Sequence, residues 1–351
     1  MVASRNADLV LEGGGVKGIA LVGAISVLEE HGYRFPRVAG TSAGAIIGAC
    51  VAAGLHAPAM RKIMEAVDYR RFKDEGLIDR FGPPGRGLSL LFEQGIFEGD
   101  YLRGWLGALL AEHGVETFAD LALEEPELKL DEAIPELQRY RLVVMASDLS
   151  SGRLVRLPWH YRELYDREPS RQRVADAVRA SMSIPFFYEP VRLVHGDQRV
   201  RALRDLHRSE SWLVDGGLLS NFPVDVFDRP AAAGAPRWPT IGIKLSLRDR
   251  HGAPPHEVHS TIDLVKRMVQ TMTGFYDQMH IDDPGTTART IFVDTLGVRA
   301  TDFEISPQTQ RALYMSGRSA ARQFLRAFDF DEYVAVHRTP GGTRALAGSA
   351  R

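Results

Sequence analysis

The stretch Val10–Ile25, VLEGGGVKGIALVGAI, joins a short apolar segment to a cluster of glycines and then to an apolar helix. Residues 7–12 are predicted to form a buried strand, and residues 18–31 a helix with apolar side chains at helical spacing. The glycines between them leave backbone N–H groups open to a negatively charged group. That group is either a bound phosphate or a charge that forms only during a reaction.

The following residues repeat the strand–helix order. Residues 37–40 are predicted to form a second strand, and SAGAIIGACVAAGL (42–55) the helix after it. This order predicts a right-handed βαβ unit, a parallel sheet and therefore an α/β fold. Further strands are predicted at 141–149, 153–158, 212–217, 240–247 and 290–295, and further helices at 172–182, 257–279 and 307–327.

The length of 351 residues suits one large α/β domain or two small ones. We expect a single domain over residues 6–330. Residues 68–135 contain many glycines and apolar side chains without a polar face, which favours an insertion over the site. The end of the chain, residues 337–351, is expected to be a disordered tail.

The charged residues give no electrostatic case for a nucleic-acid partner, because 43 basic and 45 acidic residues leave a net charge of −2. The single cysteine, Cys50, cannot form an intrachain disulfide and is predicted to be a core residue. The N-terminus has no apolar signal segment, and the longest apolar run, residues 18–28, is about half of a membrane span. We expect a cytoplasmic protein.

The glycine cluster lacks part of each of two phosphate-binding patterns, the P-loop and the dinucleotide-binding loop. A P-loop requires Lys and then Ser or Thr after the last glycine, whereas Gly18 is followed by Ile19 and Ala20. The dinucleotide pattern G-x-G-x-x-G does match at Gly13, Gly15 and Gly18. It also requires an acidic residue at the end of the second strand, and the sequence there, VAGTSAGA, contains none.

That position instead holds Gly40-Thr41-Ser42-Ala43-Gly44, which fits G-x-S-x-G on a strand-to-helix turn. The carboxyl ends of neighbouring parallel strands lie at the same edge of a sheet, so Ser42 and the glycine cluster should be neighbours. The N–H groups of Gly14, Gly15 and Val16 are then placed to stabilise an oxyanion formed at Ser42.

A serine nucleophile needs a base. The chain contains 11 histidines, and none of them stands in a recognisable catalytic motif. In WLVDGGLLSNFP, by contrast, a predicted strand ends at Asp215, and Gly216 and Gly217 allow another backbone to approach. Burial against apolar walls would raise the pKa of Asp215 and make it a useful base.

Together, EGGGVKG (12–18), GTSAG (40–44) and DGG (215–217) resemble the patatin-like phospholipase family. RASMSIPFFYEPV (179–191) and GGLLSNFPV (216–224) are similar to the segments that flank its catalytic pair. The resemblance implies a three-layer α/β/α fold with a central, mostly parallel sheet and a nucleophile elbow after the second strand.

The resemblance also implies roles for particular residues. Ser42 would be the nucleophile and Asp215 the base of a Ser-Asp dyad. The oxyanion loop would be formed by Gly13, Gly14, Gly15 and Val16. Lys17 fills the basic position of the motif, where it either contacts a lipid phosphate or holds the loop through backbone carbonyls. The supporting glycines would be Gly18, Gly40, Gly44, Gly216 and Gly217.

The implied activity is that of a serine esterase or phospholipase that cleaves fatty acyl esters through an acyl-enzyme. The family needs no metal or other cofactor, and its lipid or acyl-ester substrate implies transient contact with a membrane surface. Two alternatives stay open. One is an α/β-hydrolase-type carboxylesterase that uses Ser42, Asp215 and a histidine such as His280. The other is a nucleotide-binding module without catalysis that uses the Gly13–Gly18 loop.

Overall fold

The structure is a computed structural model that describes residues 5–68, 99–124, 134–185, 187–196, 210–229, 235–246, 283–300 and 302–338. Several predicted features lie outside these ranges. They are the helix at 257–279, two parts of the predicted insertion (69–98 and 125–133) and the tail from residue 339 onward.

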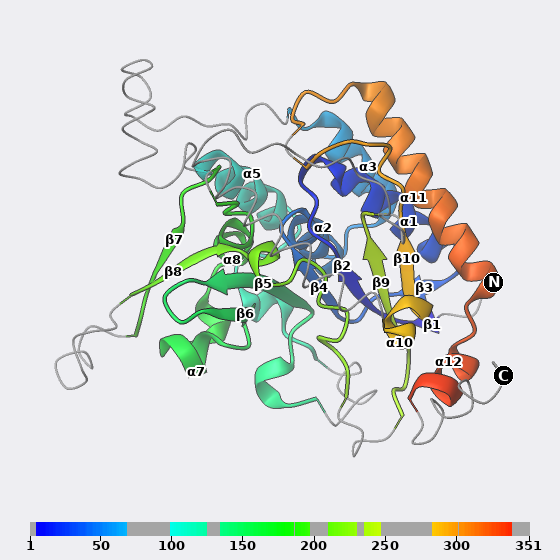
Figure 1. The fold of residues 1–351 in the computed structure, drawn as a ribbon. Helices are drawn as coiled ribbons and strands as arrows, with labels where there is room; N and C mark the ends of the chain where they lie inside the picture. The colour runs from blue at the N-terminus through cyan, green and yellow to red at the C-terminus, as the bar shows by residue number, and fades with distance from the viewer. Residues whose placement is uncertain are drawn as a thin grey trace, which may run out of the picture.

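The described chain is organised around one large, mostly parallel sheet (Figure 1). The strand order is β10-β9-β2-β4-β5-β8-β7, and β6 pairs with β5 beside this path. Neighbours from β10 to β5 run parallel, whereas β6 and β8 run antiparallel to β5, and β7 antiparallel to β8. These strands are β2 (Asp8–Leu11), β4 (Val38–Thr41), β5 (Leu142–Asp148), β6 (Arg153–Leu157), β7 (Val191–Val194), β8 (Glu210–Asp215), β9 (Thr240–Lys244) and β10 (Thr290–Phe292).

The predicted α/β class and mostly parallel sheet are therefore confirmed. Two short strands, β1 (Arg5–Asn6) and β3 (Tyr33–Arg34), pair only with each other. Because they stand apart, β4 is the second strand of the main sheet along the chain. The turn that carries Ser42 follows it directly, as predicted.

Four of the predicted helices are present in the described part of the chain, at 18–30, 43–52, 174–181 and 307–327, and further helices lie where none was predicted. The helices of eight or more residues are α1 (Gly18–Glu30), α2 (Ala43–Ala52), α3 (Ala57–Ala66), α5 (Asp100–Ala111), α8 (Val174–Ser181), α11 (Pro307–Ala327) and α12 (Phe330–His337). Short helices are α7 (Tyr161–Tyr165) and α10 (Pro284–Ala288), with 3-10 turns at Gly15–Lys17 and Gly216–Leu218 among others. Within the predicted insertion, α5 is an ordered helix that the sequence analysis missed. It buries Leu102, Leu106 and Leu110 at the four-residue spacing of a helix face.

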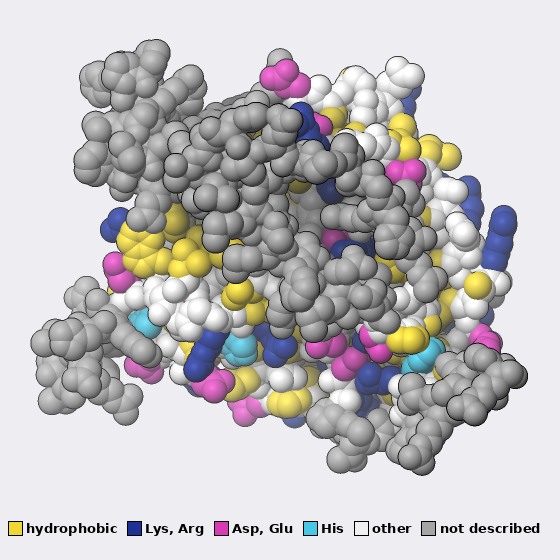
Figure 2. Space-filling model, in the orientation of Figure 1, with side chains coloured by type: hydrophobic (Ala, Val, Ile, Leu, Met, Phe, Trp, Pro, Cys, Tyr) yellow, Lys and Arg dark blue, Asp and Glu magenta, His cyan; other side chains and the backbone are white. Residues whose placement is uncertain are grey.

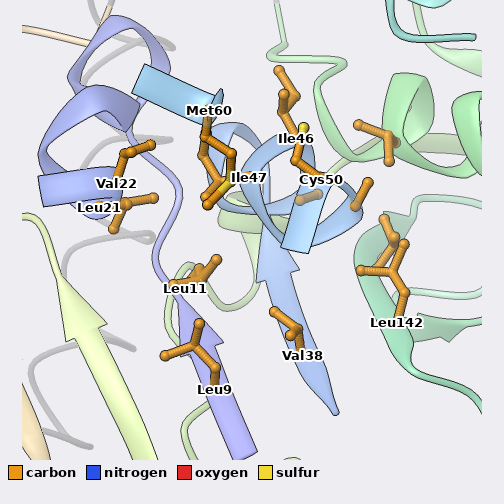
Figure 3. Packing of buried hydrophobic residues seen from close by; sticks show 14 of the residues in the cluster. Leu9, Leu11, Leu21, Val22, Val38, Ile46, Ile47, Cys50, Met60 and Leu142 are labelled. Atoms are coloured by element: carbon orange, nitrogen blue, oxygen red, sulfur yellow. The ribbon is translucent and has the colours of Figure 1, made fainter. Parts of the chain in front are cut away.

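The two faces of the sheet are covered differently. One face packs against α1, α2, α3, α5, α8 and α11 in one continuous apolar core. Figure 3 shows its centre, where Leu9, Leu11 and Val38 of the sheet lie below Ile47 of α2. Within the described residues, the other face is covered largely by the turn segment 222–227 and Trp159.

Cys50 lies in this core, as predicted (Figure 3). Burial raises the pKa of its thiol to about 12, so the reactive thiolate is not populated at neutral pH.

The N-terminal βα unit is tied to the long helix α11. Helix α11 crosses α1 at close range, because a methyl group on Gly23 would overlap the Tyr314 carbonyl and one on Gly317 the Ala20 carbonyl. Only glycine allows two helix backbones to approach this closely. The contact couples α11 to the unit that carries the glycine loop.

Candidate active site

The strand register brings Ser42 and Asp215 together. Along one edge of β5, residues Leu142–Met145 pair with β4 and residues Ala146–Asp148 pair with β8. The other edge of β5 is occupied by β6. Strand β8 therefore continues the line of β4 from the opposite direction, and the carboxyl ends of the two strands meet. Asp215 pairs with Ala146, the residue after the partner of Thr41.

Ser42 adopts a strained backbone at the turn between β4 and α2, with φ 54° and ψ −125°. A side chain other than glycine at positive φ costs about 1–3 kcal/mol and marks functional sites. The turn is tight: a methyl group on Gly40 would overlap the Gly44 carbonyl, and one on Gly44 the Leu11 carbonyl. This is the geometry of a nucleophile elbow.

Asp215 is buried at the end of β8, and its carboxylate interacts with the Ser42 hydroxyl. Removal from water raises the pKa of Asp215 to about 6, while hydrogen bonds from Ser42 and from the Gly217 N–H oppose the shift. The Gly217 N–H donates to Asp215 Oδ1 at 2.7 Å. Asp215 is thus held in place, ionised at neutral pH and more basic than an exposed aspartate.

Three consecutive residues at the end of α8 support both members of this pair. The hydroxyl of Ser181 accepts a hydrogen bond from the Ser42 N–H at 2.9 Å. The sulfur of Met182 lies 3.3 Å from Ser42 Oγ. The Ser183 carbonyl accepts from the Asp215 N–H at 2.9 Å. This segment was expected to resemble a flanking segment of the family, but its contacts with Ser42 and Asp215 were not predicted.

The glycine loop lies beside Ser42, because a methyl group on Gly13 would come within 3.0 Å of Ser42 Cβ. Two of its N–H groups are already used: Gly13 donates to Asn221 at 3.3 Å, and Val16 to Ala300 at 3.1 Å. Within the described residues, the N–H groups of Gly14 and Gly15 have no acceptor. Of the three predicted oxyanion donors, Gly14, Gly15 and Val16, the first two therefore keep an N–H group without an acceptor in the described part of the chain.

Asn221 fastens the loop at its first glycine, since its side-chain amide also donates to the Gly13 carbonyl at 3.0 Å. The Lys17 ammonium lies 3.5 Å from the Leu245 carbonyl oxygen. This contact with a backbone carbonyl agrees with the interpretation that Lys17 holds the loop in place. The contact of Asn221 with the loop was not predicted, although Asn221 belongs to the segment GGLLSNFPV that resembles the family.

A buried ion pair lies at the base of the loop. Glu12 Oε1 is 2.5 Å from Lys244 Nζ, and the other carboxylate oxygen accepts from the Leu245 N–H. Both side chains are almost fully buried. Breaking such a pair leaves an uncompensated buried charge, so Glu12 and Lys244 fix the point where the loop leaves β2.

No histidine contributes to the Asp215 pKa among the described residues. His280, the candidate third member of a triad, lies outside them. The described ranges also contain no group of three His, Cys, Asp or Glu side chains arranged to hold a metal ion.

On the face seen in Figure 2, the basic and acidic side chains that are coloured lie intermixed rather than in a field of one sign. None of the helices in the described part combines the length and apolarity needed to cross a membrane.

Comparison with known proteins identifies the family. A model of the patatin-like phospholipase domain matches residues 9–228. YqhO, an uncharacterized protein of Bacillus subtilis, is 34% identical over 323 residues, which cover 92% of this chain and 99% of YqhO.

More distant relatives share part of their length with this chain. An uncharacterized NTE family protein of Mycobacterium tuberculosis, MT2641, is 29% identical over 64% of this chain, which spans only 28% of that longer protein. The crystal structure of VipD from Legionella pneumophila aligns with 93% of this chain and 67% of VipD, at a TM-score of 0.47 and 18% identity. The family model and the full-length match to YqhO establish that this chain belongs to the patatin-like phospholipase family, whose members are lipid hydrolases.

Proposed function

We propose that this chain hydrolyses fatty acyl esters of lipids through a Ser42–Asp215 dyad and an acyl-enzyme intermediate. The observation that carries the proposal is the strand register, which brings Ser42 at the end of β4 next to the end of β8, where the buried carboxyl group of Asp215 has a pKa raised to about 6. Two N–H groups that have no acceptor among the described residues, those of Gly14 and Gly15, lie in the loop beside it. A nucleophile, a base and oxyanion donors are the parts that acyl transfer requires.

In the first half of the reaction, Ser42 Oγ attacks the ester carbonyl carbon, and its proton passes to Asp215. The oxyanion receives hydrogen bonds from Gly14 and Gly15, and the positive N-terminal end of α2 adds to its stabilisation. Collapse of the tetrahedral intermediate breaks the ester bond. The leaving alkoxide takes the proton from Asp215 and departs as an alcohol, while the acyl group stays on Ser42.

In the second half, Asp215 accepts a proton from a water molecule that attacks the acyl-enzyme. The same two N–H groups stabilise the second tetrahedral intermediate. When the bond to Ser42 breaks, Ser42 Oγ recovers its proton from Asp215 and the fatty acid leaves. One aspartate thus accepts and returns the proton in both halves of the reaction.

The two alternative functions, a carboxylesterase with a Ser-His-Asp triad and a nucleotide-binding module, have less support. A triad needs a histidine beside Asp215, and no described histidine affects its pKa. A nucleotide-binding loop needs free N–H groups along its length, whereas those of Gly13, Val16 and Lys17 donate to carbonyls of the protein.

The pH dependence of fatty-acid release tests the proposal. Asp215 acts as a base only when ionised, and its pKa is about 6. We expect kcat/KM to be constant from neutral pH to pH 8 and to fall about tenfold per pH unit well below pH 6. The assay would measure fatty acids released from glycerophospholipids, lysophospholipids and acylglycerols in the presence of a chelator.

Melting temperatures recorded across the same pH range would separate this titration from acid unfolding. Loss of activity on chelation would contradict a dyad that needs no metal. A rate that stays unchanged from pH 5 to pH 8 in folded protein would contradict the role of Asp215.

A further inference from the structure

The glycine loop folds against Leu245, a residue that lies outside the motifs of the site. Leu245 directly follows β9 and is buried in the main core. It also lies beyond residues 9–228, the range that the family model matches. Strand β9 pairs with β2, whose carboxyl end leads into the loop. The end of β9 and the start of the loop are therefore neighbours.

The backbone of Leu245 is contacted from both ends of the loop. Its N–H donates to a carboxylate oxygen of Glu12, the residue before Gly13. Its carbonyl oxygen lies 3.5 Å from the ammonium of Lys17, the residue after Val16. The position of Leu245 relative to the loop is thus set by contacts on either side of the four residues between Glu12 and Lys17.

The side chain of Leu245 meets the middle of the loop. A methyl group on Gly14 would overlap Leu245 Cδ1 and would come within 3.6 Å of Leu245 Cγ. The leucine side chain therefore packs directly on the Gly14 backbone, whose N–H is one of the two donors without an acceptor in the described ranges. A catalytic group that moves by about 1 Å can cost about 10²-fold in rate.

On the basis of the proposed function, we propose that Leu245 is a positioning residue that holds the Gly14 N–H in line with the oxyanion formed at Ser42. It acts through the loop rather than on the substrate. A smaller side chain at position 245 leaves a gap beside Gly14, and the Gly14 peptide is then free to tilt away from Ser42. Because the loss falls on the step that forms the oxyanion, kcat should fall while KM changes little.

The experiment measures kcat and KM for hydrolysis of a p-nitrophenyl ester. In Leu245→Ala we expect kcat to fall by about 10–10²-fold and KM to change by less than about threefold. Leu245→Met should keep most of the wild-type kcat, because methionine has a similar volume and covers Gly14 again. Leu245→Val should show an intermediate loss, and it provides the same comparison if Leu245→Ala does not fold.

The matched control is Ile241→Ala, which removes the same number of carbon atoms as Leu245→Ala. Ile241 is a buried residue of β9 that packs in the same core as Leu245. It precedes Leu245 by about 13 Å along the strand, away from the loop. Ile241→Ala should lose stability and keep the wild-type kcat.

A double-mutant cycle tests the contact itself. Gly14→Ala places a methyl group where Leu245 Cδ1 lies, so it should lower kcat in the wild-type background. In the Leu245→Ala background that space is open, and the same methyl group should have a smaller effect. Any backbone cost of alanine at position 14 is common to both backgrounds and cancels in the cycle. We expect a coupling of about tenfold in kcat, and effects that simply multiply would overturn the inference.

An inhibitor that forms an oxyanion provides a readout that loss of stability would not change. When Ser42 Oγ adds to the carbonyl carbon of an alkyl trifluoromethyl ketone, the Ser42 proton passes to Asp215 and the carbonyl oxygen becomes the oxyanion. The inhibition constant should rise in Leu245→Ala by about the factor by which kcat/KM falls. The pH below which kcat/KM declines should stay that of the wild type, because Asp215 is not disturbed. An unchanged inhibition constant or a shifted pH profile would overturn the inference.

The remaining outcomes separate the inference from the proposed function. Hydrolysis that requires Ser42, with equal kcat in the wild type and Leu245→Ala, would overturn the inference alone. An equal loss of kcat in Ile241→Ala would also overturn it, because loosening of the core would then explain the effect. Hydrolysis that is absent from the wild type, or that survives Ser42→Ala, would overturn the proposed function and the inference with it.

Discussion

Asp215→Asn is expected to lower kcat for ester hydrolysis by about 10³-fold or more. The amide has the shape of the carboxylate, and its oxygen still accepts the hydrogen bond from Gly217, but it cannot take the proton of Ser42. Kinetic assays at pH 8 would measure the loss. The matched control is Asp148→Asn, a buried aspartate on β5 outside the site. An Asp215→Asn enzyme with more than a tenth of the wild-type kcat would rule out Asp215 as the base.

The same substitution is expected to stabilise the protein at neutral pH. The pKa of Asp215 is raised from 3.8 to about 6, so the folded protein binds this proton more tightly than the unfolded chain does. Ionisation of Asp215 therefore costs about 3 kcal/mol of folding free energy above pH 6, and the cost disappears as the pH falls toward 4. The amide of the Asp215→Asn protein carries no charge and avoids this cost.

Thermal melts of the wild type and Asp215→Asn at pH 8 and pH 4 would measure this cost. The melting temperature of Asp215→Asn should exceed that of the wild type clearly at pH 8 and by little at pH 4. Comparing the two proteins at each pH cancels the contributions of other titrating groups. A difference in melting temperature of the same size at pH 8 and pH 4 would show that burial of the Asp215 charge does not cause it.

Gly15→Ala is expected to lower kcat by about 10²–10³-fold, the effect of losing an oxyanion donor. Gly15 has φ +55°, and a Cβ at this position would overlap the Ala300 carbonyl, which also accepts from the Val16 N–H. The loop must shift to make room, and its free N–H groups move away from Ser42. Stability should fall by more than the roughly 1–2 kcal/mol of a left-handed alanine.

Gly54→Ala is the matched control for backbone strain. Gly54 has φ +85°, and a Cβ there would have no atom within 4 Å. It should lose only the stability that the left-handed conformation costs and keep full activity. Equal kcat values in the two variants would show that the position of the glycine loop does not matter for catalysis.

The elements nearest the motifs were predictable because their signals are local in the sequence. The strand before the glycines, the helix after them, and the turn at Ser42 each depend on residues within one short stretch. Cys50 was predictable as core for the same reason, since its helix is apolar on every side. Helix α5 was missed because Gly104 and Gly107 interrupt the pattern of its leucines.

The arrangement of the site depends on pairing between distant segments, which no local pattern encodes. A strand ending in Asp215 could be predicted, but not that β8 would meet β4 end to end along one edge of β5. The Ala300 backbone carbonyl accepts a hydrogen bond from the Val16 N–H, and any residue type at position 300 would supply the same carbonyl. Ser181 and Asn221 belong to quoted segments, yet their contacts require the folded chain.

Covalent labelling would show whether Ser42 is a nucleophile that Asp215 activates. An alkyl fluorophosphonate reacts with an activated serine, and the adduct can be located by mass spectrometry of the digested protein. The account predicts one adduct, on Ser42, in the wild type, at least about 10²-fold slower labelling in Asp215→Asn, and none in Ser42→Ala. An adduct on another residue, or equal labelling rates in the wild type and Asp215→Asn, would contradict a nucleophile at Ser42 activated by Asp215.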